Sequence, residues 1–264
     1  MILLKIKKRI AICKDDVLLK IKQRIAIRKD DVFLVSYPRS GNTWVSFLLA
    51  NLIVDSRSEI NFYNVRSYIP NFDSNSYIQP TINEHRLYKS HSKYDPSYPK
   101  VIYIARDGRD VYTSYFYYLR GGFNEQQTFS EFLRYEGLYA GRWGDHVTSW
   151  LNQLEYSPNF LLIHYEDLIG DCLSQLSLMA DFIGVEVTED KLIKAIELSS
   201  YSNMKKSEIE KGRPLKEQDH VENFLRKGIT GDWKNIFNDS EKEYFKHREG
   251  DVLIRLGYET DRNW

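Results

Sequence analysis

A loop of small and polar residues, between an apolar run and an amphipathic stretch, carries the clearest chemical signal in this chain. The apolar run covers residues 32–36. The loop that follows it contains Ser40, Gly41, Asn42 and Thr43. Backbone N–H groups of such residues can approach an anion closely, and the helix that follows presents its positive dipole end to the same point. The segment therefore predicts a strand, a phosphate-binding loop and a helix.

The cation of this loop is an arginine. The loop of nucleotide triphosphatases, G-x-x-x-x-G-K-[ST], would place glycine at position 36 and lysine at position 42. Ser36 and Asn42 stand there instead, so the sequence disfavours ATP chemistry. Arg39 supplies a guanidinium that can donate two hydrogen bonds to one oxyanion and stays protonated at neutral pH.

Three segments in order resemble motifs of the cytosolic-type sulfotransferases, which use 3′-phosphoadenosine 5′-phosphosulfate (PAPS). Residues 37–44 read YPRSGNTW, beside the family's YPKSGTTW. Residues 104–114 and 226–237 match two later motifs, so the resemblance spans residues 32–237. It implies a P-loop-like enzyme that moves a sulfuryl group from PAPS to a hydroxyl or amine of a small-molecule acceptor. The product would be adenosine 3′,5′-bisphosphate (PAP), and no metal would be required.

The catalytic residues that the resemblance implies are His91, Lys89 and Arg39. Residues 87–91 resemble the family's K-T-H segment, in which the histidine is the base. Imidazole titrates near neutral pH, where it can take the proton of an attacking hydroxyl or amine. Fixed cations stabilise the charge on the transferred group. Because arginine replaces the family's lysine at position 39, it can stabilise the leaving phosphate but cannot donate a proton to it.

The remaining expected contacts are to the nucleotide. The 5′-phosphosulfate loop contributes Arg39, Ser40, Gly41, Asn42, Thr43 and Trp44. A second anion site, for the 3′-phosphate, contains Arg106, Ser114, Arg226, Lys227 and Gly228. Adenine contacts are expected from Trp44, Tyr165, Ser199, Tyr201 and Met204, although Tyr165 and Met204 could equally pack in the core. Asp232 and Trp233 are interpreted as structural, and the five histidines other than His91 as ordinary structural residues.

A single α/β domain with a central parallel sheet flanked by helices would position these residues. Strands are expected at 32–36, 101–105 and 160–164, because these runs are short, apolar and bounded by loop or helix-forming sequence. Helices are expected at 43–52, 110–118, 130–139, 146–154 and 172–183. Residues 56–80 are expected to form a loop, and ligands should bind at the carboxyl ends of the strands. The aromatic segments 62–68 and 115–118 either contact the acceptor or belong to the core.

The composition excludes some kinds of partner and some structural features, but it does not identify a function. Lysine plus arginine and aspartate plus glutamate number 37 each among 264 residues, so an anion site must be a local cluster and nucleic acid is not an expected partner. The two cysteines, Cys13 and Cys172, are too few for a disulfide framework. No apolar run approaches the roughly 18 residues of a membrane span. These features favour a cytoplasmic enzyme.

The first 31 residues form a duplicated basic extension, because residues 3–17 recur almost unchanged as 18–32. The sulfotransferase domain is therefore expected at 32–264. The family's dimerisation motif has lost its central Thr-Val pair to Asn238 and Asp239, which leaves the oligomeric state open. The alternatives are a small-molecule kinase on a related phosphate-loop fold and a catalytically silent nucleotide-binding protein.

Overall fold

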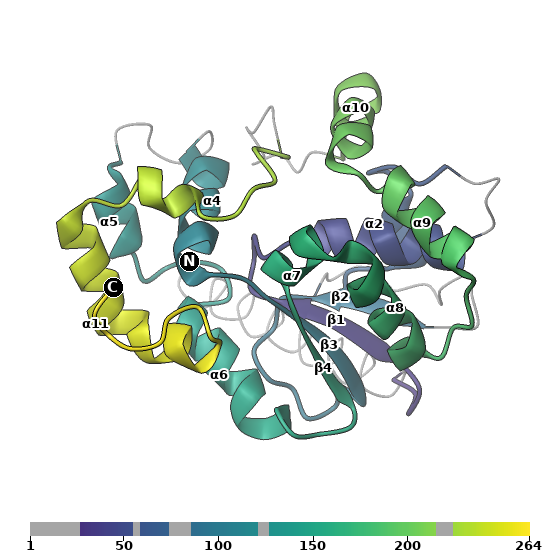
Figure 1. The fold of residues 1–264 in the computed structure, drawn as a ribbon, viewed down its shortest axis with the longest axis horizontal. Coiled ribbons are helices and arrows are strands. Elements are labelled where there is room, and N and C mark those ends of the chain that lie inside the picture. Colours follow the sequence, from purple (N-terminus) through teal and green to yellow (C-terminus); the bar gives the residue numbers. More distant parts are fainter. Residues whose placement is uncertain (1–26, 55–58, 74–85, 121–126, 215–223) are drawn as a thin grey trace, which may run out of the picture.

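Four parallel strands form the centre of the molecule. The computed structural model describes residues 27–54, 59–73, 86–120, 127–214 and 224–264. The strands are β1 (Val32–Ser36), β2 (Leu87–Ser90), β3 (Lys100–Ala105) and β4 (Phe160–His164), and they lie in the order β2-β1-β3-β4. All pairings are parallel, with Val32 opposite Leu87 on one side and Lys100 on the other (Figure 1). The carboxyl ends of all four strands therefore meet at one edge of the sheet.

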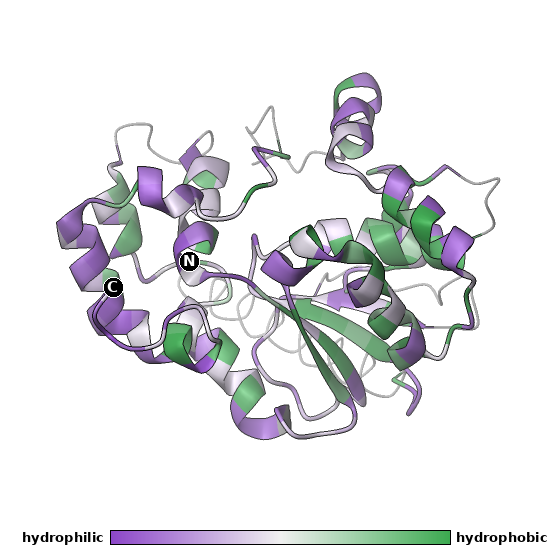
Figure 2. Ribbon diagram, in the orientation of Figure 1, coloured by the Kyte–Doolittle hydropathy of each residue, from purple (hydrophilic) through white to green (hydrophobic). Residues whose placement is uncertain are grey.

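Helices cover both faces of this sheet. Leu34 packs into one core and its neighbours Phe33 and Val35 pack into the other, as the two-residue period of a strand requires. The first core is completed by helices α2 (Asn42–Ile53), α8 (Cys172–Ile183), α9 (Glu189–Leu198) and α10 (Tyr201–Lys211). The second is completed by α4 (Gly108–Arg120), α5 (Phe129–Leu133), α6 (Trp143–Leu154) and α11 (Asp239–Arg255). Figure 2 shows hydrophobic residues concentrated on the strands, whereas α11 is largely hydrophilic.

The predicted single α/β domain with a parallel sheet is confirmed, and several of its elements lie where expected. β1, β4 and α8 have the predicted bounds, and β3 begins one residue earlier. Helices α2, α4 and α6 begin one to three residues before their predicted starts. The helix predicted at 130–139 is wrong in length, because α5 ends at Leu133. Ala140 and Gly141 both have a positive φ, and Gly137 has low helix propensity, so the chain turns here instead.

Two short elements contradict the prediction for the segments between β1 and β3. The predicted loop at 56–80 contains the one-turn helix α3 (Val65–Tyr68), whose Val65 is buried and which is too short to show a helical period. Strand β2 was not predicted, because it has four residues and includes a lysine and a serine. His91 therefore follows directly after a strand of the sheet, instead of lying in a connection before one.

The chain after β4 adds elements that the sequence analysis did not predict. Besides α9, α10 and α11, these are α7 (Tyr165–Gly170) and the 3₁₀ helix η1 (Asp232–Asn235). Asn238, in the altered dimerisation motif, is the N-cap of α11 and forms a capping box with Glu241. Within the described ranges, none of the helices is long and apolar enough to cross a membrane. Most of the duplicated N-terminal extension, with Cys13, lies outside the described residues.

Candidate active site

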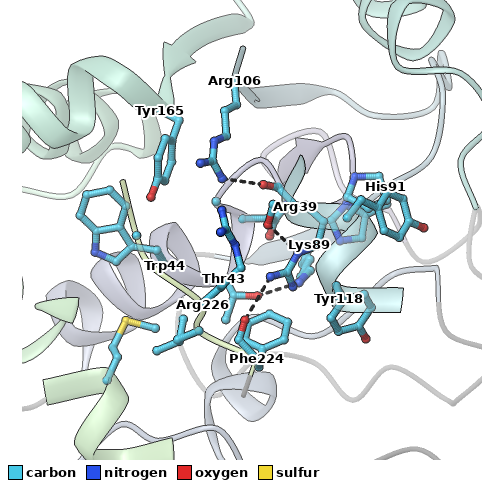
Figure 3. Close-up of a pocket in the computed structure, with 18 of the residues that line it drawn as sticks. Arg39, Thr43, Trp44, Lys89, His91, Arg106, Tyr118, Tyr165, Phe224 and Arg226 are labelled. Atoms are coloured by element: carbon cyan, nitrogen blue, oxygen red, sulfur yellow. Dashed lines mark hydrogen bonds between the residues drawn. The ribbon is translucent and has the colours of Figure 1, made fainter. Parts of the chain in front are cut away.

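A cavity of about 540 Å³ opens at the carboxyl ends of the strands. Residues 38–44 after β1, with the exception of Ser40, line it together with His91 after β2, Arg106 after β3 and Tyr165 after β4. In Figure 3, Trp44 and Tyr165 lie at one end of this cavity, and His91 and Tyr118 lie at the other. The cavity therefore lies at the edge of the sheet where ligands are expected to bind.

The loop after β1 has the geometry of an anion site. Gly41 is the N-cap of α2 and has φ +99°, so the loop turns directly into the helix. The Asn42 side chain points back into the protein and donates to the Leu34 carbonyl at 3.1 Å and to Ser36 Oγ at 3.2 Å. The Ser40 hydroxyl is buried and has no hydrogen-bond partner among the described residues, and Ser40 does not line the cavity. Asn42 therefore fixes the loop, and the N-terminus of α2 points toward the cavity.

Substituting Gly41 by alanine should destabilise the protein more than the same substitution at Gly184. A Cβ at Gly41 would lie 2.5 Å from Cδ2 of Tyr165, whereas at Gly184, which also has a positive φ, nothing lies within 4 Å. Positive φ costs an alanine roughly 1–2 kcal/mol, and overpacking typically adds about 1–3 kcal/mol. Denaturant unfolding of both variants separates the cost of a positive φ, which both variants share, from the cost of overpacking, which only Gly41→Ala should show. Equal losses of free energy of unfolding would contradict the close approach of the loop to Tyr165.

Arg39 lies at the centre of the cavity and is held by its surroundings. Its Nε donates to Ser114 Oγ at 3.3 Å, and its Nη2 donates to the Phe224 carbonyl at 3.0 Å. The guanidinium also lies over the rings of Tyr118 and Phe224, each 4.6 Å from the ring centre. Burial lowers the pKa of Arg39 to about 10, with Arg106 contributing, so the side chain remains a cation at neutral pH.

Lys89 and His91 face the same part of the cavity from the end of β2. Lys89 Nζ donates to Thr43 Oγ1 at 3.4 Å, which places this ammonium beside the anion loop. His91 Nδ1 lies 2.7 Å from the Ser36 carbonyl, to which it must donate because a carbonyl only accepts. The neutral ring consequently carries its lone pair on Nε2. Burial, followed by the charge of Lys89, holds the pKa of His91 well below its usual value, so the ring is neutral at pH 7.

A second histidine, which the sequence analysis left as an ordinary residue, contacts the backbone of His91. His146 Nε2 donates to the His91 carbonyl at 3.1 Å, and its Nδ1 lies 2.9 Å from the hydroxyl of Tyr103. His146 is fully buried, and burial lowers its pKa to about 4. A neutral His146 with its proton on Nε2 therefore supports the position of His91.

The predicted second anion site is assembled from β3, α4 and the segment before η1. Arg106 donates to the carbonyls of Arg39 and Ile229, at 3.1 and 2.9 Å, while its Nε is buried without a partner among the described residues. Ser114 is buried beside Arg39. These residues line the cavity together with Arg226, Lys227 and Gly228, as predicted.

Asp232 is structural, as expected, because it neutralises the basic pair beside it. Arg226 and Lys227 contact its carboxylate at 2.6 and 2.8 Å. Burial raises the pKa of Asp232, but the hydrogen bonds from Lys227 and Arg226 outweigh this effect and lower the pKa to about 2. Asp110 accepts the amides of Gly231 and Trp233 and so holds the same segment against α4.

The remaining predicted nucleotide contacts line the cavity, with one exception. Trp44, Tyr165, Tyr201 and Met204 are among the lining residues, and Figure 3 shows Trp44 and Tyr165 at the end opposite His91. Ser199 does not line the cavity, because its hydroxyl accepts from Asn51 and its carbonyl accepts from Trp44 Nε1 at 3.0 Å. Ser199 therefore positions Trp44 from behind instead of facing the cavity.

Several lining residues were not predicted as site residues. They are Pro38, Arg66, Asn71, Asp73, Tyr139, Arg213, Phe224, Leu225 and Ile229. Tyr115 and Tyr118 line the cavity, as one of the two interpretations of segment 115–118 proposed, whereas Phe62 belongs to the core. Phe224 and Leu225 are the two residues before the motif that begins at Arg226, which is a signal that could have identified them. Among the described residues, no group of three or more histidine, cysteine, aspartate or glutamate side chains could hold a metal ion.

Comparison with known families identifies the class of protein. The model of the sulfotransferase domain matches residues 29–253, so the chain belongs to this family. The expectation of a sulfotransferase is thereby confirmed.

Individual relatives agree with this class. Sulfotransferase 2B1 of Rattus norvegicus is 31% identical over 232 residues, which cover 81% of this chain and 68% of the relative. The 3-alpha-hydroxysteroid sulfotransferase of Cavia porcellus is 30% identical over 233 residues, which cover 80% of this chain and 79% of the relative. The crystal structure of mouse sulfotransferase SULT7A1 complexed with PAP has a TM-score of 0.66 and 26% identity, covering 88% of this chain and 89% of the other. Retinol dehydratase in complex with retinol and PAP shares the fold, with a TM-score of 0.67 and 23% identity.

Proposed function

We propose that this protein transfers the sulfuryl group of PAPS to a hydroxyl or amine of a small molecule, with His91 as the general base. The observation that carries the proposal is the convergence of a neutral histidine, an anion loop and a second cluster of cations on one cavity. The PAP-bound sulfotransferase structure among the relatives supports the nucleotide.

The residues that line the cavity suit a nucleotide that carries phosphate groups at both its 3′ and its 5′ position. PAPS supplies an activated sulfuryl group on a phosphate that leaves. The α2 N-terminus, Arg39 and Lys89 would hold the phosphosulfate, and Arg106, Ser114, Arg226 and Lys227 would hold the 3′-phosphate. The buried Arg106 Nε lines the cavity and has no hydrogen-bond partner among the described residues, so it is a polar atom that a bound anion could satisfy. The aromatic pair Trp44 and Tyr165 offers surfaces for adenine.

The proton step is assigned to His91. Its Nδ1 proton is held by the Ser36 carbonyl, so Nε2 is the atom that accepts the proton of the acceptor hydroxyl or amine. The resulting imidazolium gives up the proton to solvent after the product leaves. Arg39 and Lys89 provide fixed positive charge where negative charge accumulates, and Arg39 does so without changing its protonation state.

The acceptor would be a small molecule that binds at the His91 end of the cavity. Tyr115, Tyr118 and Tyr139 line this end and combine aromatic surface with hydroxyl groups. Known relatives include a hydroxysteroid sulfotransferase and a retinol dehydratase with bound retinol. We assign the catalytic domain to residues 32–264 and, from the motif resemblance, propose that it acts in the cytoplasm.

Thermal unfolding with PAP, AMP and ATP tests the nucleotide without knowledge of the acceptor. A ligand at about 100 times its Kd stabilises the folded state by roughly 2.7 kcal/mol. PAP should raise the unfolding temperature at a concentration where AMP, which lacks the 3′-phosphate, has little effect. Stabilisation by ATP but not by PAP would overturn the proposal in favour of a small-molecule kinase, and no stabilisation by any of the three would indicate a silent protein.

A further inference from the structure

A carboxylate outside the recognised motifs holds the chain at the point where His91 leaves the sheet. Asp73 Oδ2 accepts the backbone N–H of His91 at 2.5 Å. Asp73 Oδ1 accepts the hydroxyls of Ser90 and Ser92 at 2.7 and 2.9 Å. We propose that Asp73 is a positioning residue for the catalytic base, and that its three hydrogen bonds fix the direction in which the His91 ring enters the cavity. The proposal rests on the assignment of His91 as the base.

His91 is held at three points, and Asp73 provides one of them. The backbone N–H is bound by Asp73, the backbone carbonyl accepts from His146, and Nδ1 donates to the Ser36 carbonyl. These partners come from three separate parts of the chain, so the ring cannot turn without breaking one of the bonds. Loss of Asp73 releases the His91 peptide group on the side of β2, where the ladder with β1 goes no further than Ser90.

The Asp73 network is anchored in the core. Ser90 is fully buried, its hydroxyl also lies 3.1 Å from that of Tyr98, and it accepts the amide of Ser92 at 3.0 Å. Tyr98 stacks on Phe33 of β1, with ring centres 3.8 Å apart. The carboxylate therefore connects the base to the rigid centre of the sheet instead of to a surface loop.

Asp73 also faces the site itself. It lines the cavity, and the Tyr139 hydroxyl, which lines the same end, donates to Asp73 Oδ2 at 3.4 Å. The Tyr139 hydroxyl is protonated at neutral pH and is therefore the donor in this contact. An aspartate that only stabilised a turn would not need to line the cavity or to accept a hydrogen bond from Tyr139.

Asp95 provides a matched control for a purely local role. It accepts the amide and the hydroxyl of Ser97 at 2.9 and 2.7 Å, so its side chain stabilises a local turn two residues along the chain. Asp95 does not line the cavity and has no hydrogen bond to His91 among those described. Asp95→Ala therefore removes an aspartate-held turn without touching the base.

The pKa of His91 can be measured, and it would not change if Asp73 had only a structural role. The groups that act on the ring are Lys89, Arg39 and His146, which lower its pKa, and the Ser36 carbonyl, which raises it, while burial is the largest cause of the lowered value. If Asp73→Ala releases the His91 ring, water reaches the ring and removes part of the effect of burial on its pKa. The pKa of His91 should then rise toward the ordinary value near 6.5.

The test compares Asp73→Ala, Asp73→Asn and Asp95→Ala in the full chain. NMR titration of the His91 ring, assigned with His91→Gln, should show a higher pKa in Asp73→Ala and an unchanged pKa in Asp95→Ala. With PAPS and 2-naphthol as the probe acceptor, kcat of Asp73→Ala should fall about 10- to 100-fold, since small misplacements of a reacting group cost up to about 100-fold. KM for PAPS and the affinity for PAP should stay within about twofold. Asp73→Asn, which keeps one accepting oxygen, should lie between wild type and Asp73→Ala.

The outcomes separate this inference from the proposed function. If Asp73→Ala and Asp73→Asn leave both kcat and the pKa of His91 at the wild-type values, or lower only the unfolding temperature, Asp73 is merely structural and the inference is wrong. If Asp73→Ala does not fold, Asp73→Asn and Ser92→Ala, which each remove part of the network, decide the same question. His91→Ala is measured in parallel. Unchanged turnover in that variant overturns the base assignment and the Asp73 proposal together, whereas lost turnover with unaffected Asp73 variants overturns the Asp73 proposal alone.

Discussion

His91→Ala should lower turnover by about 10²- to 10⁴-fold while leaving the affinity for PAP close to that of the wild type. A positioned general base typically contributes an acceleration of this size. The ring is neutral at pH 7 and its Nδ1 proton is already committed to Ser36, so removal of the side chain removes the proton acceptor from the cavity. Turnover with PAPS and 2-naphthol, together with PAP binding measured by calorimetry, checks both parts.

The rate in the same assay should depend on pH, in the direction that the lowered pKa of His91 determines. Because burial and Lys89 depress the pKa of His91, the neutral base is present above pH 6.5, and kcat/KM should fall only as the pH drops below that value. His247 lies exposed on α11, away from the cavity, so His247→Ala is the matched control and should change neither rate nor profile. Wild-type turnover in His91→Ala would remove the histidine from the mechanism.

Arg106→Ala should abolish most of the discrimination between PAP and AMP. The guanidinium lies in the predicted 3′-phosphate site, at the end of β3, and hydrogen bonds to charged groups contribute about 1.5–3 kcal/mol each. The affinity for PAP should therefore fall about 10- to 100-fold. AMP has no 3′-phosphate, so its weaker binding should change much less. Calorimetric titration of both nucleotides into each variant gives the ratio directly.

A second arginine shows whether the effect is specific. Arg120 is exposed at the end of α4 and does not line the cavity, so Arg120→Ala should leave both affinities unchanged. Arg106 also donates to the carbonyls of Arg39 and Ile229, so a general loosening of the cavity would weaken PAP and AMP by the same factor. An equal loss for the two nucleotides would therefore assign Arg106 a supporting role and leave the 3′-phosphate site unexplained.

The parts of the fold that could be predicted from the sequence are those with strong local signals. β1, β3 and β4 are continuous apolar runs buried between two layers of helices, and the loop after β1 joins a strand to a helix. Most predicted site residues follow from ordered motifs, and the structure brings them to one cavity because parallel strands end at the same edge.

The rest depends on contacts that the local sequence does not encode. β2 is recognisable only through its pairing with β1, because its own residues include Lys89 and Ser90. Asp73 belongs to no motif, and its role arises when residues 90–92 are brought beside it by the sheet. Ser199 was predicted to face the nucleotide, but its hydroxyl accepts a hydrogen bond from Asn51 of α2, a partner 148 positions away.

Arg39 and Arg106, two of the three arginines proposed to bind the nucleotide, also hold residues 224–229 through the carbonyls of Phe224 and Ile229. Glu208 binds the amides of Phe224 and Leu225 at 2.5 and 3.3 Å, so this segment is anchored to α10 as well. A phosphate that draws Arg39 or Arg106 toward itself must compete with these carbonyls. Nucleotide occupancy and the local stability of residues 224–229 are thereby linked, and amide hydrogen exchange in this segment becomes a direct reporter of the fraction of the protein that holds the product.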